Sequence, residues 1–205
     1  MSIMFGLADI IEAGIEKVVV IIPARGGSKR LPRKNIYPIW GKPMLWWAIS
    51  AAKESKYVGE IWVTTEDAEI KEVALNCGAK VHDRDKTLAQ DHIYKMDAIR
   101  DCYEQILGKN GREIVISLQA NSPEITSEIL DAAIGTFLKH NRNELISVGP
   151  DLMQNAAFRI MRGDYVLQRD LSTKCGVYVC DLQDVHTIED VRNIEEKDEN
   201  NRRSV

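Results

Sequence analysis

A glycine-rich and strongly basic segment holds the residues with the clearest chemical potential. It reads Arg25-Gly-Gly-Ser-Lys-Arg-Leu-Pro-Arg-Lys-Asn35 and directly follows a β-branched apolar run. Although the chain has a formal net charge of −4, no Asp or Glu occurs between Lys17 and Lys53. Gly26 and Gly27 allow a tight turn in which backbone N–H groups face an anion. The segment therefore predicts a phosphate-binding loop.

Three side chains of this loop suit the same chemistry. Arg25 can hold two phosphate oxygens, Ser28 offers a hydroxyl donor, and Lys34 provides a mobile point charge. The loop is neither the Walker pattern G-x-x-x-x-G-K-[ST] nor G-x-G-x-x-G. A solvated basic turn is the simpler alternative. The position of the loop, directly after the first strand, favours binding of the triphosphate of a nucleotide.

The elements around the loop indicate an α/β fold. Lys17-Val-Val-Val-Ile-Ile22 carries apolar side chains for both faces, which is typical of a central parallel strand covered by helices on both sides. Strand and helix patterns then alternate, which predicts a doubly wound, mostly parallel sheet in a single domain, residues 1–205. We expect strands at residues 17–22, 60–65, 79–82, 113–118, 144–148 and 175–180. We expect helices at residues 43–56, 67–77, 92–108, 126–140 and from 187.

Two segments depart from this alternation. Residues 1–16 predict an N-terminal helical extension. Residues 151–174 predict a short excursion from the sheet, with a hairpin at 156–168 around Arg162-Gly-Asp164. This excursion is a candidate contact for a homodimer.

The predicted topology also gives the place of a site. Ligands of such sheets bind beyond the carboxyl ends of the strands. The basic loop, the turn after Thr65 and the turn after Leu118 all lie there. We therefore expect these three segments to form one site.

Composition excludes several classes of function. The chain is acidic overall, which argues against bulk nucleic-acid binding. It shows neither a secretory signal nor an apolar stretch long enough to span a membrane. Its four cysteines form no C-x-x-C pair, which indicates reduced thiols and a cytoplasmic location.

The first motif carries a family resemblance. Ile22-Pro-Ala-Arg-Gly-Gly-Ser-Lys-Arg-Leu-Pro-Arg-Lys-Asn35, followed by Gly41-Lys-Pro-Met-Leu45, resembles the N-terminal signature of the acylneuraminate (CMP-sialic acid) cytidylyltransferase family. The resemblance runs from about Val18 to Asp190. It implies a nucleotide-diphospho-sugar transferase fold, which is Rossmann-like. It also implies a reaction in which a sugar hydroxyl attacks the α-phosphate of CTP, pyrophosphate leaves and Mg²⁺ neutralises charge.

The resemblance also implies roles for individual residues. Lys34 and Arg25 would be catalytic through charge stabilisation. The residues expected to bind the nucleotide are Ala24, Arg25, Gly26, Gly27, Ser28, Lys34, Asn35 and Arg84. Arg84 is included because His82-Asp-Arg84 and Leu88-Ala-Gln-Asp91 are similar to a family stretch near the nucleotide, where Asp91 would organise the loop or cap a helix.

Two further stretches are similar to acceptor and metal motifs. Leu118-Gln-Ala-Asn-Ser-Pro123 stands where the family faces the sugar, so Gln119, Asn121 and Ser122 are expected to bind the acceptor, although such residues also form simple turns. Asp184-Val-His186-Thr-Ile-Glu-Asp190 stands where the family has two metal-binding aspartates. Asp184 is the expected metal ligand. His186 replaces the second aspartate and is a poor ligand for Mg²⁺.

Other positions leave alternatives open. Thr64-Thr65-Glu66-Asp67 is similar to a family turn but is more simply a helix cap. Asp184 and Thr187 could merely begin the last helix. Cys175 stands where the family has an asparagine on the sugar side.

The sequence therefore predicts a cytidylyltransferase that activates an N-acylneuraminate or related nonulosonate. Its partners would be CTP and the acidic sugar, and a homodimer is possible. The alternatives are an enzyme for another acidic acceptor, Kdo-like or phosphonate, and a nucleotide-binding protein without catalysis.

Overall fold

The computed structural model describes residues 15, 17–106, 111–170 and 172–203. The helix predicted within residues 1–16 lies outside this range apart from residue 15. A sheet of seven strands forms the centre of the fold, in the order β5-β4-β1-β6-β8-β7-β9. The strands are β1 (Lys17–Pro23), β4 (Val58–Thr65), β5 (Lys80–Asp83), β6 (Glu113–Leu118), β7 (Glu144–Val148), β8 (Gln154–Arg162) and β9 (Cys175–Val179).

The helices follow the predicted alternation. They are α2 (Met44–Glu54), α3 (Ala68–Asn76), α4 (Lys95–Ile106), α5 (Ser127–Lys139), α6 (Gly163–Val166) and α7 (Ile188–Arg203). Short 3-10 turns form η1 (Lys34–Ile36) and η2 (Lys86–Ala89), and β2 (Pro38–Ile39) pairs with β3 (Lys42–Pro43). No helix within these described residues is both long and apolar enough to cross a bilayer.

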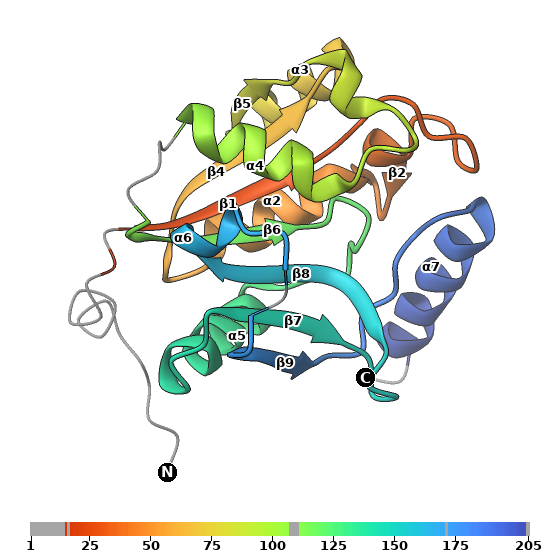
Figure 1. Ribbon diagram of the computed structural model, residues 1–205. Coiled ribbons are helices and arrows are strands. Elements are labelled where there is room, and N and C mark those ends of the chain that lie inside the picture. Colours follow the sequence, from red (N-terminus) through yellow and green to blue (C-terminus); the bar gives the residue numbers. More distant parts are fainter. Residues whose placement is uncertain (1–14, 16, 107–110, 171, 204–205) are drawn as a thin grey trace.

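The sheet is mostly parallel, as predicted. β1 pairs in parallel with β4 and β6, β4 with β5, and β7 with β9. β8 runs antiparallel to both of its neighbours, β6 and β7. The carboxyl ends of the parallel strands therefore meet at one edge of the sheet, where the loop after β1 and helix α7 also lie (Figure 1).

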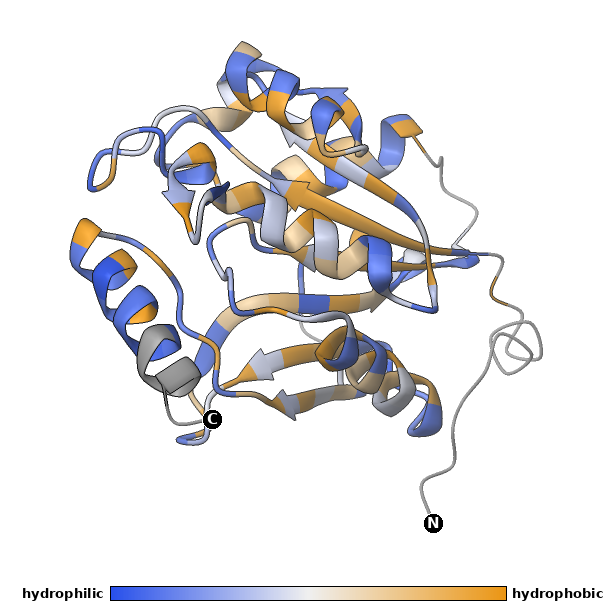
Figure 2. Cartoon of the chain, turned by 180° about the vertical axis from the view of Figure 1, so that it is seen from behind, coloured by the Kyte–Doolittle hydropathy of each residue, from blue (hydrophilic) through white to orange (hydrophobic). Residues whose placement is uncertain are grey.

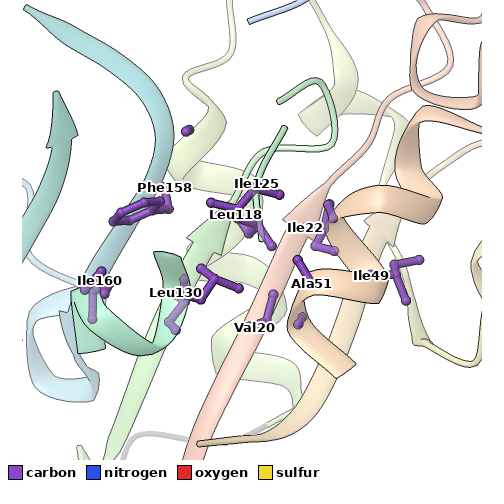
Figure 3. Packing of buried hydrophobic residues seen from close by; sticks show 14 of the residues in the cluster. Val20, Ile22, Ile49, Ala51, Leu118, Ile125, Leu130, Phe158 and Ile160 are labelled. Atoms are coloured by element: carbon purple, nitrogen blue, oxygen red, sulfur yellow. The ribbon is translucent and has the colours of Figure 1, made fainter. Parts of the chain in front are cut away.

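The β-branched run of β1 is buried on both faces. Val20 and Ile22 pack on one side against α2 and α5, in the cluster that Figure 3 shows from close by. Val19 and Ile21 pack on the other side in a cluster with residues of α4. Figure 2 shows β1 as a continuous hydrophobic strand. Burying each of these side chains contributes about 1.5–3 kcal/mol, so the doubly wound prediction has a direct energetic basis.

The hairpin predicted at residues 156–168 is wrong. One strand of nine residues, β8, runs from Gln154 to Arg162 and is followed by the helical turn α6. The physical reason is that apolar side chains serve both faces of this strand: Phe158 and Ile160 join the core on one face, and Met161 joins the core on the other. A strand with apolar side chains on both faces is stable inside a sheet that is covered on both sides, and not in an isolated hairpin.

Gly163 allows α6 to lie close to the sheet. A Cβ at this position would lie 2.6 Å from Oη of Tyr103 and 2.9 Å from Oε2 of Glu113. The Tyr103 hydroxyl donates a hydrogen bond of 3.1 Å to that buried carboxylate. A larger residue would therefore displace either α6 or this buried pair.

Helix α7 packs against the segment after the basic loop. A separate apolar cluster joins the two: Leu31, Ile39, Met44, Val185, Val191 and Ile194. Trp40 and Trp47 border this cluster and meet edge to face, with ring centroids 5.0 Å apart. This packing holds residues 184–190, at the start of α7, close to the basic loop.

Candidate functional site

The backbone of the basic loop is held by its neighbours. The N–H of Ala24 bonds the carbonyl of Thr64 at 3.1 Å, which continues the pairing of β1 with β4. The Asn35 amide donates to the carbonyl oxygen of Arg25 at 2.9 Å and closes the loop. The loop therefore leaves the sheet at a fixed point and returns to it at another.

The N–H of Gly26 faces an anion, and this anion is a carboxylate of the protein itself. This N–H donates to Oε1 of Glu66 at 2.8 Å. A Cβ at Gly26 would lie 2.3 Å from Oδ2 of Asp67, whereas nothing lies within 4 Å of a Cβ at Gly27. Gly26 is thus required by the close approach of the turn after β4, a constraint that does not apply to Gly27.

Arg33 ties the loop to the start of α3. Its guanidinium bonds both carboxylate oxygens of Asp67, at 2.6 and 2.9 Å, and Glu69 at 2.6 Å. Asp67 also accepts the N–H groups of Glu69 and Ile70, so the predicted helix cap is confirmed. The hydrogen bond from Arg33 outweighs burial and lowers the pKa of Asp67.

Basic side chains of the loop surround a cavity of about 260 Å³. Its lining residues are Arg25, Ser28, Lys29, Arg30, Lys34, Asp91 and His186. Asp91 pairs with Arg25 at 2.9 Å and with Lys29. The predicted phosphate ligands Arg25, Ser28 and Lys34 are therefore brought together, and Asp91 organises two of the cations.

Lys34 is the most desolvated cation of this cavity. Burial lowers its pKa, and Arg30 and Arg25 lower it further, while Asp184 and Asp190 act in the opposite direction. An anion bound in the cavity would stabilise the charged ammonium. Lys34 is therefore suited to meet a phosphate.

A second cavity, of about 240 Å³, adjoins the first and shares three of its residues. Its lining residues are Pro23, Arg25, Lys34, Asn35, Arg84, Leu88, Gln90, Asp91, Ile93, Lys95, Gln119 and Asn121. Residues predicted for the nucleotide and residues predicted for the acceptor thus line one continuous region.

Arg84 is buried and already paired. Its guanidinium bonds Oε2 of Glu66, and their side chains are 4% and 13% exposed. Burial raises the pKa of Glu66, but the bonds from Arg84 and the N–H of Gly26 outweigh it and the pKa is lowered. Arg84 therefore reaches the loop through Glu66, a residue that the sequence suggested only as part of a cap.

The turn after β6 clamps Asp184. The hydroxyl of Ser122 donates to Oδ1 of Asp184. Asn121 and Val185 exchange two bonds, from the Asn121 amide at 3.1 Å and from the Val185 N–H at 2.8 Å. Burial raises the pKa of Asp184, although the bond from Ser122 and nearby cations oppose this. The predicted acceptor and metal residues are thus neighbours.

His186 lies at the phosphate cavity and contacts Arg30, with 3.2 Å between Nδ1 and Nη2. Burial lowers its pKa, and Lys34 and Arg30 lower it further, which favours the neutral imidazole that can accept from Arg30. Asp190 accepts the N–H groups of His186 and Thr187, each at 2.8 Å, at the start of α7. In the part of the chain that the structure describes, no three His, Cys, Asp or Glu residues form a metal-binding group.

Three residues at the site were not singled out from the sequence. Glu66 links Gly26 to Arg84, Arg30 meets His186, and Lys95 lines the second cavity. The excess of basic residues in the loop includes Arg30 and could have identified it. Lys95 belongs to no motif, although it follows Asp91 by four residues, and the fold places it at the site.

Comparison with known proteins identifies relatives. The family model described as "Cytidylyltransferase" matches residues 19–199. N-acylneuraminate cytidylyltransferase A of Danio rerio is 36% identical over 131 residues, which are 64% of this chain and 30% of that protein. Pseudaminic acid cytidylyltransferase of Campylobacter jejuni is 38% identical over 133 residues, which are 64% of this chain and 57% of that protein. The match thus spans only about a third to a little over half of these relatives.

A solved structure shows the same fold. It is a CMP:2-keto-3-deoxy-manno-octonic acid synthetase complexed with CTP, with a TM-score of 0.75 and 17% identity. The alignment covers 91% of this chain and 100% of that one. The predicted Rossmann-like nucleotide-diphospho-sugar transferase fold is therefore confirmed.

Proposed function

The chain belongs to the cytidylyltransferase family, and on this premise we propose that it transfers the cytidylyl group of CTP to a hydroxyl of an acidic sugar. A sugar hydroxyl attacks the α-phosphate, the bond to the β-phosphate oxygen breaks, and pyrophosphate leaves. The observation that carries the proposal is the pair of adjoining cavities. One is lined by the cations of the basic loop, and the other by residues of both the loop and the turn after β6.

The loop supplies the phosphate site. Arg25, Ser28 and Lys34 bind the triphosphate, and Lys34 meets the charge that develops as pyrophosphate leaves. Nucleotidyl transfer depends mainly on positioning and charge stabilisation, so no protein nucleophile is needed. Lys34 and Arg25 are accordingly the catalytic residues.

The other loop residues hold or contact the nucleotide. Ala24, Gly26 and Gly27 bring the backbone close to it, and Asn35 contacts it while closing the loop. Arg84 contributes at the second cavity, with Glu66 fixing its guanidinium. CTP is proposed as the nucleotide on the strength of the family.

Mg²⁺ is the proposed cofactor, and the residues present offer it one carboxylate ligand. Mg²⁺ commonly takes one or two carboxylates together with phosphate oxygens and waters. Asp184 provides one carboxylate, oriented by Ser122. His186 offers a nitrogen and not an oxygen, so it is the weaker candidate. When bound, the ion would neutralise phosphate charge.

The acceptor would lie over the turn after β6. Gln119, Asn121 and Ser122 are the proposed contacts on this side. Because the Asn121 amide bonds Val185, it acts mainly by fixing the segment that carries Asp184. Relatives are named for N-acylneuraminate, pseudaminic acid and 3-deoxy-manno-octulosonate. We propose an N-acylneuraminate or related nonulosonate here.

A panel assay tests this function. The purified chain is incubated with Mg²⁺, each of the four ribonucleoside triphosphates, and N-acetylneuraminate, pseudaminate, Kdo, a phosphonate or a neutral hexose. Pyrophosphate release is followed with time. The proposal expects release with CTP and a nonulosonate. Release only with Kdo or a phosphonate would change the acceptor, and CTP binding without release would favour a homologue that has lost catalysis.

We also propose that two copies of the chain pair through residues 151–174 and the adjoining strand β9. Leu152 and Met153 are 66% and 69% exposed, and Val177 and Val179 are 53% and 51% exposed. β9 is the last strand of the sheet and pairs only with β7 among the described strands. An unpaired apolar edge favours association with another strand.

The charges beside β9 are self-complementary. Antiparallel pairing of two copies, centred between Val177 and Tyr178, would place Lys174 of each copy opposite Asp181 of the other. Val177→Lys is therefore expected to convert a dimer into a monomer in light scattering, while Leu75→Lys, at an equally exposed position of α3, leaves the mass unchanged. A wild-type monomer at micromolar concentration would refute the pairing.

We further propose a cytoplasmic location. All four cysteines are free, although Cys102 and Cys180 are buried. Free thiols suit a reducing compartment, where CTP is also available. Fractionation of the native host tests this, and recovery in a secreted fraction would refute it.

A further inference from the structure

Lys95 is a cation at the site that the mechanism above does not use. It is the first residue of α4 and lines both the second cavity and a small recess beside it. Among the described residues, none forms a hydrogen bond or ion pair with its side chain. Lys95 is exposed, yet the protein atoms near its ammonium desolvate it enough to lower its pKa. An anion bound there would pair with an ammonium that has no other hydrogen-bond or ion-pair partner among the described residues.

Lys95 has a different set of charged neighbours from Lys34, although both side chains line the second cavity. Asp184 acts electrostatically on both Lys34 and Lys95. The other cations that act on Lys34 are Arg30 and Arg25, whereas the one that acts on Lys95 is Arg159 of β8. Lys95 also lines the small recess, whose lining contains no residue of the basic loop, so an anion in that recess would be distinct from a triphosphate held by the loop.

A second donor points to the same anion. Nε2 of Gln119 is buried and has no hydrogen-bond partner, and Gln119 lines the recess together with Lys95. Arg159 also lines this recess, but its guanidinium is taken by the buried carboxylate of Glu144. Lys95 and Gln119 thus remain as a free charge and a free N–H donor that line the same recess. A buried donor without a partner is unfavourable, so a ligand that accepts from it gains affinity.

We propose that Lys95 and Gln119 bind the carboxylate of the acidic acceptor, and that Lys95 makes the site select an acid over a neutral sugar. This inference rests on the proposed function and deepens it, because it assigns the group that recognises the acid. A carboxylate fits the pair, since one oxygen can meet the ammonium and the other the amide. The rest of the sugar would then extend toward Ser122 and Asp184.

Lys95→Gln tests the inference, because it removes the charge and keeps a similar length. The acceptor KM at saturating CTP is expected to rise about 10- to 100-fold, as for loss of one charge-assisted hydrogen bond. The Kd of CTP, measured by calorimetry without acceptor, is expected to stay within about 2-fold. Lys95→Arg keeps most of the acceptor affinity, and Lys139→Gln, an exposed change on α5, serves as the matched control.

A substrate pair separates the carboxylate from the rest of the sugar. The wild type is expected to prefer the free acid over its methyl ester, and Lys95→Gln is expected to lose that preference. An unchanged acceptor KM, or an unchanged preference, would overturn the inference while leaving the proposed function intact. A Kd of CTP that rises as much as the acceptor KM would also overturn it, since Lys95 would then serve the phosphates. Failure of the wild type with every acid would instead refute the proposed function, and equilibrium binding of the acid to the CTP-loaded variants would still test Lys95.

Discussion

Glu66 gives the sharpest test of how the basic loop is supported. It accepts the N–H of Gly26 at 2.8 Å and pairs with Arg84, whose side chain is only 4% exposed. Glu66→Ala would leave that guanidinium buried and unpaired, which costs about 3–5 kcal/mol. The lost bond to Gly26 adds about 1 kcal/mol. The total is a large fraction of the stability of a domain of this size.

Urea unfolding at pH 7 measures this loss from the shift in midpoint at a common slope. The matched control is Glu69→Ala, which removes a carboxylate that is 71% exposed and shares Arg33 with Asp67. An exposed pair of this kind contributes about 0–1 kcal/mol. The Kd of CTP is measured on the same samples, and Glu66→Ala is expected to raise it because the loop loses its anchor.

The double variant Glu66→Ala/Arg84→Met distinguishes a buried charge from general damage. Removing both partners takes away the unpaired charge, so the double variant is expected to be more stable than Glu66→Ala alone. Equal midpoint shifts for Glu66→Ala and Glu69→Ala would refute this reasoning. So would a double variant that is no more stable than the single one.

Three further predictions concern pH, packing and the metal. The hydrogen bond from Trp62, aided by two lysines, lowers the pKa of Glu60 to about 2. The ionised Glu60 therefore stabilises the folded state fully above the unfolded pKa near 4.5, and this contribution is lost as the pH falls toward 2. Glu60→Gln is therefore expected to flatten the loss of stability in acid, and an unchanged profile of urea midpoint against pH would contradict this. Phe137→Ala, at a position with 0% exposure, is expected to cost about 3–5 kcal/mol in the same assay, and a cost below about 1 kcal/mol would show that the site does not pack as described. His186→Asp is expected to lower the Mg²⁺ concentration for half-maximal turnover several-fold, because a carboxylate is a harder ligand than imidazole; a rise would contradict it.

The local pattern of residues was sufficient for much of the fold. The run from Lys17 to Ile22 predicts a strand buried on both faces, and its side chains do alternate between two helix-covered clusters. Asp67 predicts a cap, and it caps α3. These features depend on neighbours in sequence, so the sequence alone contains them.

The pairing of strands that are distant in sequence was harder to predict from the sequence. Residues 156–168 have turn-forming residues at Arg162-Gly-Asp164, which suggested a hairpin. The strand instead lies between β6 and β7, because both of its faces find an apolar partner that only the folded sheet provides. The turn at Gly163 is real, but it begins a helix against Tyr103.

At the site, too, local features were predicted from the sequence and features that depend on long-range packing were not. The loop residues Arg25, Ser28 and Lys34 meet in one cavity, as their spacing suggested. The sequence predicts that the backbone at Gly26 faces an anion, but it does not predict that the carboxylate of Glu66 is an anion that Gly26 binds. Lys95 follows the Leu88–Asp91 motif by four residues but matches no motif itself, and the packing of α4 against β1 brings it to the site.

Whether Lys34 stabilises the transition state of cytidylyl transfer is decided by comparing pyrophosphate release by the wild type and Lys34→Ala, with CTP, Mg²⁺ and a nonulosonate. Lys34 is the desolvated cation of the phosphate cavity, and loss of a charge that stabilises the transition state lowers the rate by about 10²–10³-fold. We expect a fall of that size in kcat, with an unchanged urea midpoint and an active Lys139→Ala control. Full turnover by a folded Lys34→Ala variant would contradict it.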